Sequence, residues 1–119
     1  MDSPAPRRGE VWRVSLDPAI GAEIKKTRPA VVLSRDAVGR LPLKLVAPLT
    51  EWKGDFQNSF WLVRVDPDDA NGLSKPSATD ALQLRCVDTR RFVEKLGELS
   101  VPVMDDIARA VVAVISFRP

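Results

Sequence analysis

The stretch Pro29-Ala30-Val31-Val32-Leu33-Ser34 is the most informative local feature of the sequence. Its central residues are all apolar and do not alternate with polar ones, and two of them are β-branched valines. A short run of this kind, bounded by turn-forming residues, is typical of a strand that is buried on both faces of a sheet. We therefore expect a buried strand at this position.

Four further segments are expected to be strands, because each is a short apolar or alternating run next to proline, aspartate or glycine. They are residues 11–16, 43–49, 59–65 and 81–87. In the first segment, Trp12, Val14 and Leu16 share one face of the strand. In the second, Pro48 marks an edge or a bulge near the end of the strand.

The spacing of apolar residues changes near the C-terminus. From Val103 to Ile115 they recur at intervals of three and four residues, which is the spacing of one helical face. Ser100 can cap this helix, and Pro102 is tolerated in a first turn. A shorter helix is expected over residues 89–96. The sequence thus predicts a mainly β fold, a small antiparallel barrel or curled sheet, with a C-terminal helix packed across it.

The length of 119 residues suits one compact domain and is too short for two. Residues 1–8 contain two prolines and two arginines, so we expect a flexible arm there, followed by a single domain at residues 9–119. No stretch approaches the ~18 uninterrupted apolar residues of a membrane span, and the N-terminus lacks the apolar centre of a signal peptide. We therefore expect a cytoplasmic protein.

The sequence contains no histidine and a single cysteine, Cys86. This composition excludes an internal disulfide, a serine-histidine triad, a thiol-imidazole pair and a histidine-ligated metal. The net charge is only +2, but residues 1–50 hold nine Lys or Arg against five acids. Such an excess is compatible with a surface that faces phosphates, and equally with an ordinary solvated surface.

Two loops have features of functional segments. Residues 17–27 are long for a hairpin loop in so small a domain and carry several charges, which is typical of functional loops. Residues 66–72 resemble the start of a calcium-binding loop, but Ala70 occupies the fifth ligand position and no glutamate follows at the twelfth. We expect an acidic turn at residues 66–72.

Arg28 and Thr50 form the candidate reactive pair. Arg28 precedes the buried strand, and Thr50 follows the strand at residues 43–49. If these strands are antiparallel neighbours, the start of one lies beside the end of the other, and the guanidinium and the hydroxyl share one rim of the sheet. Arginine and threonine are also common at strand ends that have no function, so spacing alone leaves both interpretations open.

A set of motifs in order resembles the MazF/PemK family of toxin endoribonucleases. The motifs are Gly-Glu-Val-Trp at residues 9–12, Gly21-Ala22-Glu23, Arg28-Pro29 with the valine run, Val46-Ala47-Pro48-Leu49-Thr50, Gln83-Leu84-Arg85 and the C-terminal helix. The resemblance implies an SH3-like barrel of the CcdB/PemK plasmid-maintenance toxin type, a homodimer, and cleavage of single-stranded RNA without metal or other cofactor. It also implies inhibition by an antitoxin, whose acidic, partly disordered segment would compete with RNA for a cationic groove.

The resemblance further implies that Arg28 and Thr50 are catalytic. In metal-free RNA cleavage the ribose 2′-OH attacks the adjacent phosphorus, giving a 2′,3′-cyclic phosphate and a 5′-hydroxyl. Arg28 can contact two phosphoryl oxygens, and Thr50 can donate one more hydrogen bond. Glu23 is the nearest candidate in the sequence to orient Arg28 or to accept the 2′-OH proton; alternatively it is a salt-bridge partner that fixes the loop.

Candidate RNA contacts comprise lysines for phosphates, aromatic rings for base stacking, and polar side chains near residue 83 for base edges. They are Lys25, Lys26, Lys53, Trp52, Phe56, Gln83 and Arg85. Each lysine can equally be a solvated surface residue, Phe56 a core residue and Gln83 a polar position within the sheet. Many family members carry a glycine-rich turn between the glutamate and the arginine, where this chain has residues 24–27, Ile-Lys-Lys-Thr. The two added lysines should make its loop bind RNA differently.

Two other functions stay open at this point. One is a non-enzymatic poison on the same barrel, as in the CcdB relatives that trap DNA gyrase, although those relatives lack the Arg-Thr pair. The other is an inactive barrel that only binds an antitoxin.

Overall fold

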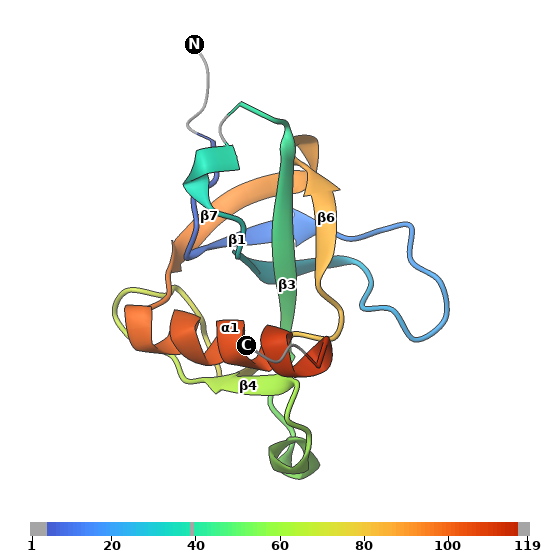
Figure 1. The fold of residues 1–119 in the computed structure, drawn as a ribbon, viewed down its shortest axis with the longest axis vertical. Coiled ribbons are helices and arrows are strands. Elements are labelled where there is room, and N and C mark those ends of the chain that lie inside the picture. Colours follow the sequence, from blue (N-terminus) through green and yellow to red (C-terminus); the bar gives the residue numbers. More distant parts are fainter. Residues whose placement is uncertain (1–4, 39, 117–119) are drawn as a thin grey trace.

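The computed structural model describes residues 5–38 and 40–116, and within them seven strands form one antiparallel sheet. The strands are β1 (Glu10–Ser15), β2 (Thr27–Val32), β3 (Leu43–Glu51), β4 (Leu62–Val65), β5 (Ser77–Asp80), β6 (Arg85–Asp88) and β7 (Phe92–Glu98). They pair in the order β4-β5-β3-β2-β1-β7, and β6 also pairs with β3. The helix α1 (Val101–Val114) lies across one face of this curled sheet (Figure 1). The predicted mainly β fold with a C-terminal helix is confirmed, although no pairing of β4 with β7 closes the barrel among the described strands.

Strand β2 lies between β1 and β3 and is buried on both faces, as its sequence predicts. On one face, Val31 packs in a cluster that includes Ile107 of α1. On the other face, Ala30 and Val32 pack in a second cluster that includes Val14. The sheet therefore separates two apolar clusters, and α1 covers only the first.

The C-terminal helix begins two residues before the predicted Val103, and Ser100 is its N-cap as expected. The Ser100 hydroxyl accepts a hydrogen bond from the Val103 N–H. Met104, Ile107 and Ala110 form its buried face. None of the helices in the described ranges combines the length and the apolar character that crossing a membrane requires.

The predicted strand at residues 81–87 is only partly correct, because the chain forms two strands here, β5 and β6, along the same edge of β3. Leu49 of β3 pairs with Thr79 of β5, and Val46 of β3 pairs with Arg85 of β6. An advance of three residues along β3 therefore corresponds to six residues of the segment opposite it. The extra residues form a turn at 81–84. This break lies opposite Pro48, which has no N–H to donate to a ladder.

The helix predicted over residues 89–96 is wrong. Residues Thr89–Arg91 form a short 3-10 turn, and β7 follows it. β7 pairs with the outer edge of β1, and Phe92 packs edge-on against Trp12 with ring centroids 5.6 Å apart. Pairing with β1 and the aromatic contact therefore outweigh a local pattern that also suits a helix.

The strand predicted at residues 59–65 is shorter in the structure. A 3-10 helix, η2 (Gly54–Asn58), and a turn precede β4, which begins only at Leu62. Strand β3, in contrast, extends past residue 49 to Glu51, because Thr50 and Glu51 pair with residues of β5. This extension places Thr50 within the sheet rather than after it.

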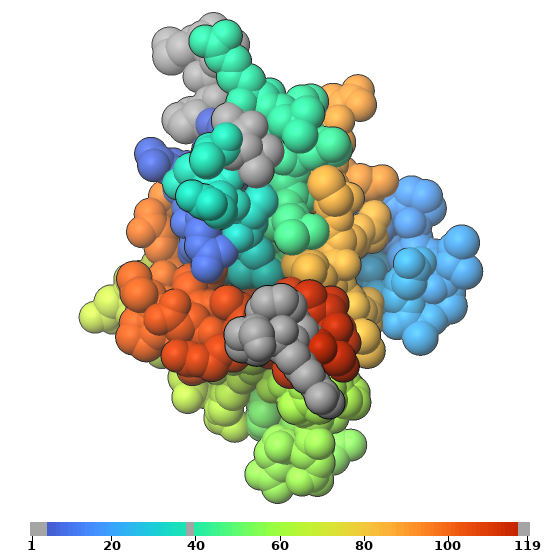
Figure 2. All heavy atoms as spheres, in the orientation of Figure 1, coloured from blue at the N-terminus to red at the C-terminus, as the bar shows by residue number. Residues whose placement is uncertain are grey.

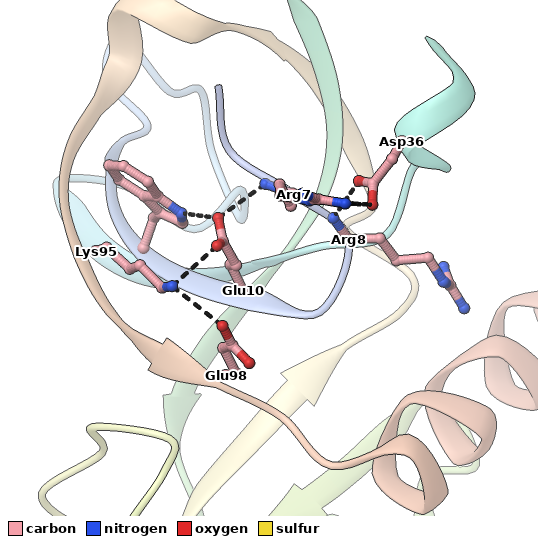
Figure 3. A network of polar contacts seen from close by, with 7 residues as sticks. Arg7, Arg8, Glu10, Asp36, Lys95 and Glu98 are labelled. Atoms are coloured by element: carbon pink, nitrogen blue, oxygen red, sulfur yellow. Dashed lines mark hydrogen bonds and ion pairs between the residues drawn. The ribbon is translucent and has the colours of Figure 1, made fainter. Parts of the chain in front are cut away.

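Arg7 and Arg8, at the end of the arm expected over residues 1–8, contact the folded domain. The Arg8 N–H donates to Asp36 at 2.8 Å, and the Arg7 guanidinium pairs with the same carboxylate at 3.3 Å (Figure 3). Next to them, the Glu10 carboxylate accepts from the Arg7 N–H and pairs with Lys95 of β7 at 2.9 Å. Burial would raise the pKa of Glu10, but these contacts outweigh it and lower the pKa. Residues 1–4 of the expected arm lie outside the described residues.

Residues 66–72 form an acidic turn, as predicted, and this turn packs directly onto β7. The Asp68 carboxylate accepts hydrogen bonds from the N–H groups of Ala70 and Asn71 at 2.8 Å. The Ala70 carbonyl in turn accepts from the Glu98 N–H at 2.9 Å. Gly97 lies at the point of closest approach, where a side chain would have no space.

Candidate functional site

Arg28 and Thr50 lie opposite each other at one end of the sheet. Their strands, β2 and β3, are antiparallel, and Ala30 pairs with Pro48. Arg28 and Thr50 each lie two residues beyond this last pair, at the same end of the two strands, and both line the same two pockets. The structure therefore brings the two residues of the candidate pair together.

Two surface pockets meet at this pair. Both are lined by Arg28, Thr50 and Glu51. The first, of about 280 Å³, extends toward β1 and the segment that precedes β5, and we call it the cationic pocket. The second, of about 590 Å³, extends toward η2 and the turn at residues 81–84, and we call it the aromatic pocket. The pair thus lies where one continuous surface depression changes its chemical character.

The cationic pocket contains two basic residues that sequence reasoning missed, Arg13 and Lys75. Arg13 projects from β1 and pairs with Glu94 at 3.1 Å, and Lys75 pairs with Glu51 at 3.4 Å. With Arg28, the pocket is lined by three cationic groups, and the carboxylates that pair with them are Glu94 and Glu51, so one positive charge is in excess. This balance favours an anionic ligand such as a phosphate.

The aromatic pocket contains the predicted Lys53 and Phe56, and also Trp61, which sequence reasoning missed. Trp52 packs edge-on against Phe56, with ring centroids 5.7 Å apart, and the Arg64 guanidinium lies 5.2 Å from the centre of the Trp52 ring. Trp52 therefore supports Phe56 without lining the pocket. The η2 segment that carries Phe56 projects at the lower end of the molecule in Figures 1 and 2, in green.

Glu23 does not lie with Arg28. Its carboxylate accepts a hydrogen bond from the Ile20 N–H at 2.6 Å, which closes a turn within the loop at residues 17–27. Its side chain lines a different pocket, beside Arg85, and no ion pair of Glu23 occurs among the described residues. The Glu23 carboxylate is thus engaged by a local turn of the loop, and both interpretations of Glu23 from the sequence stay predictions.

Lys25, Lys26 and Arg85 lie outside the two pockets. Both lysines are exposed on the loop at residues 17–27, which projects to the right in Figures 1 and 2, in blue. Lys26 has a φ of 70°, a left-handed conformation that is uncommon for a residue with a side chain. The Arg85 guanidinium donates to the Leu16 carbonyl at 3.2 Å and so supports the start of this loop.

Gln83 lines the aromatic pocket, but both ends of its amide already have partners. Its Oε1 accepts from the Ile24 N–H at 2.6 Å, and its Nε2 donates to the Asp80 carboxylate at 3.2 Å. Asp80 also accepts from the N–H groups of Leu82 and Gln83. Asp80 is 8% exposed, and its burial raises the pKa of the carboxyl group.

The residues that sequence reasoning missed reach the site from strands and from the segments that connect them. They are Arg13, Glu51, Lys75, Asp80 and Trp61. Only Glu51 had a sequence signal, because it directly follows Thr50. Within residues 5–38 and 40–116, no three acidic or cysteine side chains are grouped in a way that could hold a metal ion.

The chain is similar in sequence to one family of toxins. Residues 7–115 match the family of PemK-like, MazF-like toxins of type II toxin-antitoxin systems. The endoribonuclease MazF9 of Mycobacterium tuberculosis is 31% identical over 110 residues, which cover 87% of this chain and 91% of that protein. The endoribonuclease EndoA of Bacillus subtilis is 28% identical over 106 residues, which cover 87% and 89%.

Solved structures give the same result. MazF from Deinococcus radiodurans superposes with a TM-score of 0.81 at 26% identity, covering 97% of this chain and 100% of the other. A mycobacterial endoribonuclease, solved in complex with its cognate antitoxin, has the same fold, with a TM-score of 0.75 at 20% identity, covering 97% and 99%. The family match over nearly the whole chain, together with these relatives, shows that the chain belongs to the PemK-like, MazF-like toxins of type II toxin-antitoxin systems.

Proposed function

We propose that this toxin endoribonuclease cleaves single-stranded RNA without a metal ion, at the edge where Arg28 and Thr50 meet. The observation that carries the proposal is the position of this pair at the junction of the cationic and aromatic pockets. A chain of nucleotides can enter one pocket and leave through the other, which places an internal phosphodiester at the pair. This arrangement suits an endonuclease better than an enzyme that trims ends.

The two pockets suit different parts of an RNA chain. Arg13 and Lys75 can hold backbone phosphates in the cationic pocket. Phe56 and Trp61 can stack on unpaired bases in the aromatic pocket. Between them, the Arg28 guanidinium stabilises the charge that develops on the phosphoryl oxygens.

The reaction itself uses the substrate's own nucleophile. The 2′-oxygen bonds to phosphorus and the bond from phosphorus to the 5′-oxygen breaks, so the products carry a 2′,3′-cyclic phosphate and a 5′-hydroxyl. The 2′-OH proton needs an acceptor, and the departing 5′-oxygen takes a proton from solvent. We assign the acceptor role to Glu51, which lines both pockets, in place of Glu23.

Glu51→Gln is therefore expected to reduce cleavage by about 100-fold or more, because it removes a general base. Glu23→Gln should retain most of the activity, because an amide oxygen can still accept from the Ile20 N–H. Initial cleavage rates of both variants on one fluorogenic RNA will compare them. If Glu23→Gln abolishes cleavage and Glu51→Gln does not, the assignment of the base is wrong.

Thr50→Val tests the second member of the pair with little change in volume. Loss of the hydroxyl removes one hydrogen bond to the phosphate, so we expect a 10- to 100-fold loss of cleavage, in line with about 1.5 to 3 kcal/mol for a charged hydrogen bond. The assay uses a long single-stranded RNA with chelator present, and sequencing of the fragment ends. Intact RNA together with arrested gyrase would instead favour the poison, and intact RNA with antitoxin binding alone would favour the inactive barrel.

We also propose that the chain acts as a homodimer in the cytoplasm, where mRNA is available, and that an acidic antitoxin blocks the RNA groove. The three cationic groups of the cationic pocket support the second part, because an acidic segment would be attracted to the same residues as RNA. Exposed apolar residues such as Phe60 and Ile115 support association with another protein surface.

A further inference from the structure

A chain of hydrogen bonds connects a buried carboxylate to the reactive guanidinium. Asp80, at the end of β5, accepts from the Gln83 side-chain amide at 3.2 Å. Gln83 accepts from the Ile24 N–H at 2.6 Å. The Arg28 side chain then donates from Nε to the carbonyl of Lys25, the next residue, at 3.3 Å. The order along this path is Asp80, Gln83, the backbone at residues 24–25 and Arg28.

The direction of each hydrogen bond fixes the orientation of the Gln83 amide. A backbone N–H can only donate, so the atom that faces Ile24 has to be the amide oxygen. A carboxylate can only accept, so the atom that faces Asp80 has to be the amide nitrogen. These two hydrogen bonds therefore fix the orientation of the Gln83 amide, with its oxygen toward the loop and its nitrogen toward β5.

The path matters because the other hydrogen bonds between the loop at residues 17–27 and the rest of the fold lie at the ends of the loop, while the Ile24 side chain packs against the second apolar cluster. Near its start, the Leu16 carbonyl accepts from Arg85, and the Asp17 carbonyl accepts from Arg91. At its other end, Lys26 donates to the Asp17 side chain. The bond to Gln83 ties the loop to the turn at residues 81–84, next to the residues that precede Arg28.

We propose that Asp80 and Gln83 form a latch that holds the loop at residues 17–27 and thereby positions Arg28 for cleavage. Gln83 is then a positioning residue and not a reader of RNA bases. This inference rests on the proposed function of Arg28. Its structural half, the restraint on the Ile24 N–H, can be measured independently of cleavage.

The polarity of the latch allows a swap experiment. In Gln83→Glu, two carboxylates face each other. In Asp80→Asn, the Gln83 amide nitrogen faces another donor in either orientation, because it meets the amide nitrogen of the new asparagine or, if it flips, the Ile24 N–H. Each single variant therefore loses one hydrogen bond of the path. In the double variant Asp80→Asn with Gln83→Glu, the new asparagine donates, the new glutamate accepts from both sides, and the total charge is unchanged.

The experiment measures hydrogen exchange at the Ile24 amide, kcat, KM and the cleaved sequence motif for the wild type, both single variants and the double variant. Each single variant should exchange the Ile24 amide faster, in Asp80→Asn because the Gln83 amide can turn its donor toward Ile24, and in Gln83→Glu because repulsion from Asp80 displaces the new carboxylate. Each should lose roughly tenfold in kcat, with KM and motif nearly unchanged, because orientation and not binding is impaired. The double variant should recover both exchange protection and kcat. Thermal unfolding of each variant identifies any that fail to fold. If Asp80→Asn does not fold, Gln83→Glu, at a half-buried position, provides the single-variant measurement of exchange and kcat.

Three outcomes would overturn the latch. The first is an altered cleavage motif with unchanged Ile24 exchange, which would make Gln83 a base reader. The second is faster Ile24 exchange with unchanged kcat, which would make the contact structural only. The third is no recovery in the double variant. A wild-type protein that cleaves no RNA would instead contradict the proposed function, while the exchange data would still test the latch.

Discussion

Arg28→Ala is expected to reduce RNA cleavage by about 100- to 1000-fold while leaving the fold intact. The guanidinium lies at the junction of the two pockets, where the scissile phosphate would bind, and losing one such electrostatic donor typically has an effect of this size. The Arg28 side chain is exposed and forms no ion pair among the described residues, so its removal should not change stability. Single-turnover cleavage with chelator present measures the loss.

Two matched variants separate the role of Arg28 from a general effect of positive charge. Arg28→Lys keeps the charge but not the planar fork, so it should give an intermediate loss. Arg109→Ala removes an exposed arginine on α1 that only pairs with Asp106, and should leave cleavage unchanged. Equal losses in Arg28→Ala and Arg109→Ala would mean that charge, and not the position of Arg28, controls the reaction.

Gly97→Ala is expected to lower the free energy of unfolding by about 3 kcal/mol or more, at the upper end of overpacking effects. A Cβ at this position would lie 2.2 Å from the Ala70 carbonyl oxygen and 2.5 Å from the carbonyl carbon of Asn71. Both are backbone atoms of the acidic turn, so no side chain can rotate away. At roughly 4 °C per kcal/mol, Tm should fall by more than ~10 °C.

Gly54→Ala is the matched control for this prediction. Gly54 begins η2, and an added Cβ there has no neighbour within 4 Å. Urea unfolding of the two variants will give midpoints to compare, with the m-value as a check that unfolding stays two-state. A Gly97→Ala midpoint as high as that of Gly54→Ala would show that the acidic turn is free to move away from β7.

The sequence predicted those parts of the fold whose local pattern agrees with their final environment. The valine run became β2, and Ser100 became the cap of α1. Strand β5 was missed because Ser77–Asp80 is short and has no alternating apolar pattern. Its residues are buried because β3 and β4 pair with it on either side, which no local pattern reveals.

The candidate site was predictable to the same limited extent. Arg28 and Thr50 could be paired from the sequence because one antiparallel register connects them. Glu23 was chosen because it is close to Arg28 in sequence, whereas its side chain lines a different pocket. Asp80 and Arg13 could not be found, because they approach from β5 and β1, and only the three-dimensional arrangement of the strands places them near Arg28.

The pairing of β1 with β7 has a consequence for how the toxin is made. Glu10 of β1 lies opposite Glu98 of β7 in the strand register, and the Leu99 N–H donates to the Gly9 carbonyl at 2.8 Å. One side of β1 is therefore completed by a strand far along the sequence. Such distant pairings form slowly, and on a ribosome they have to wait until most of the protein has been synthesised. A growing chain therefore lacks its finished sheet until β7 has been synthesised.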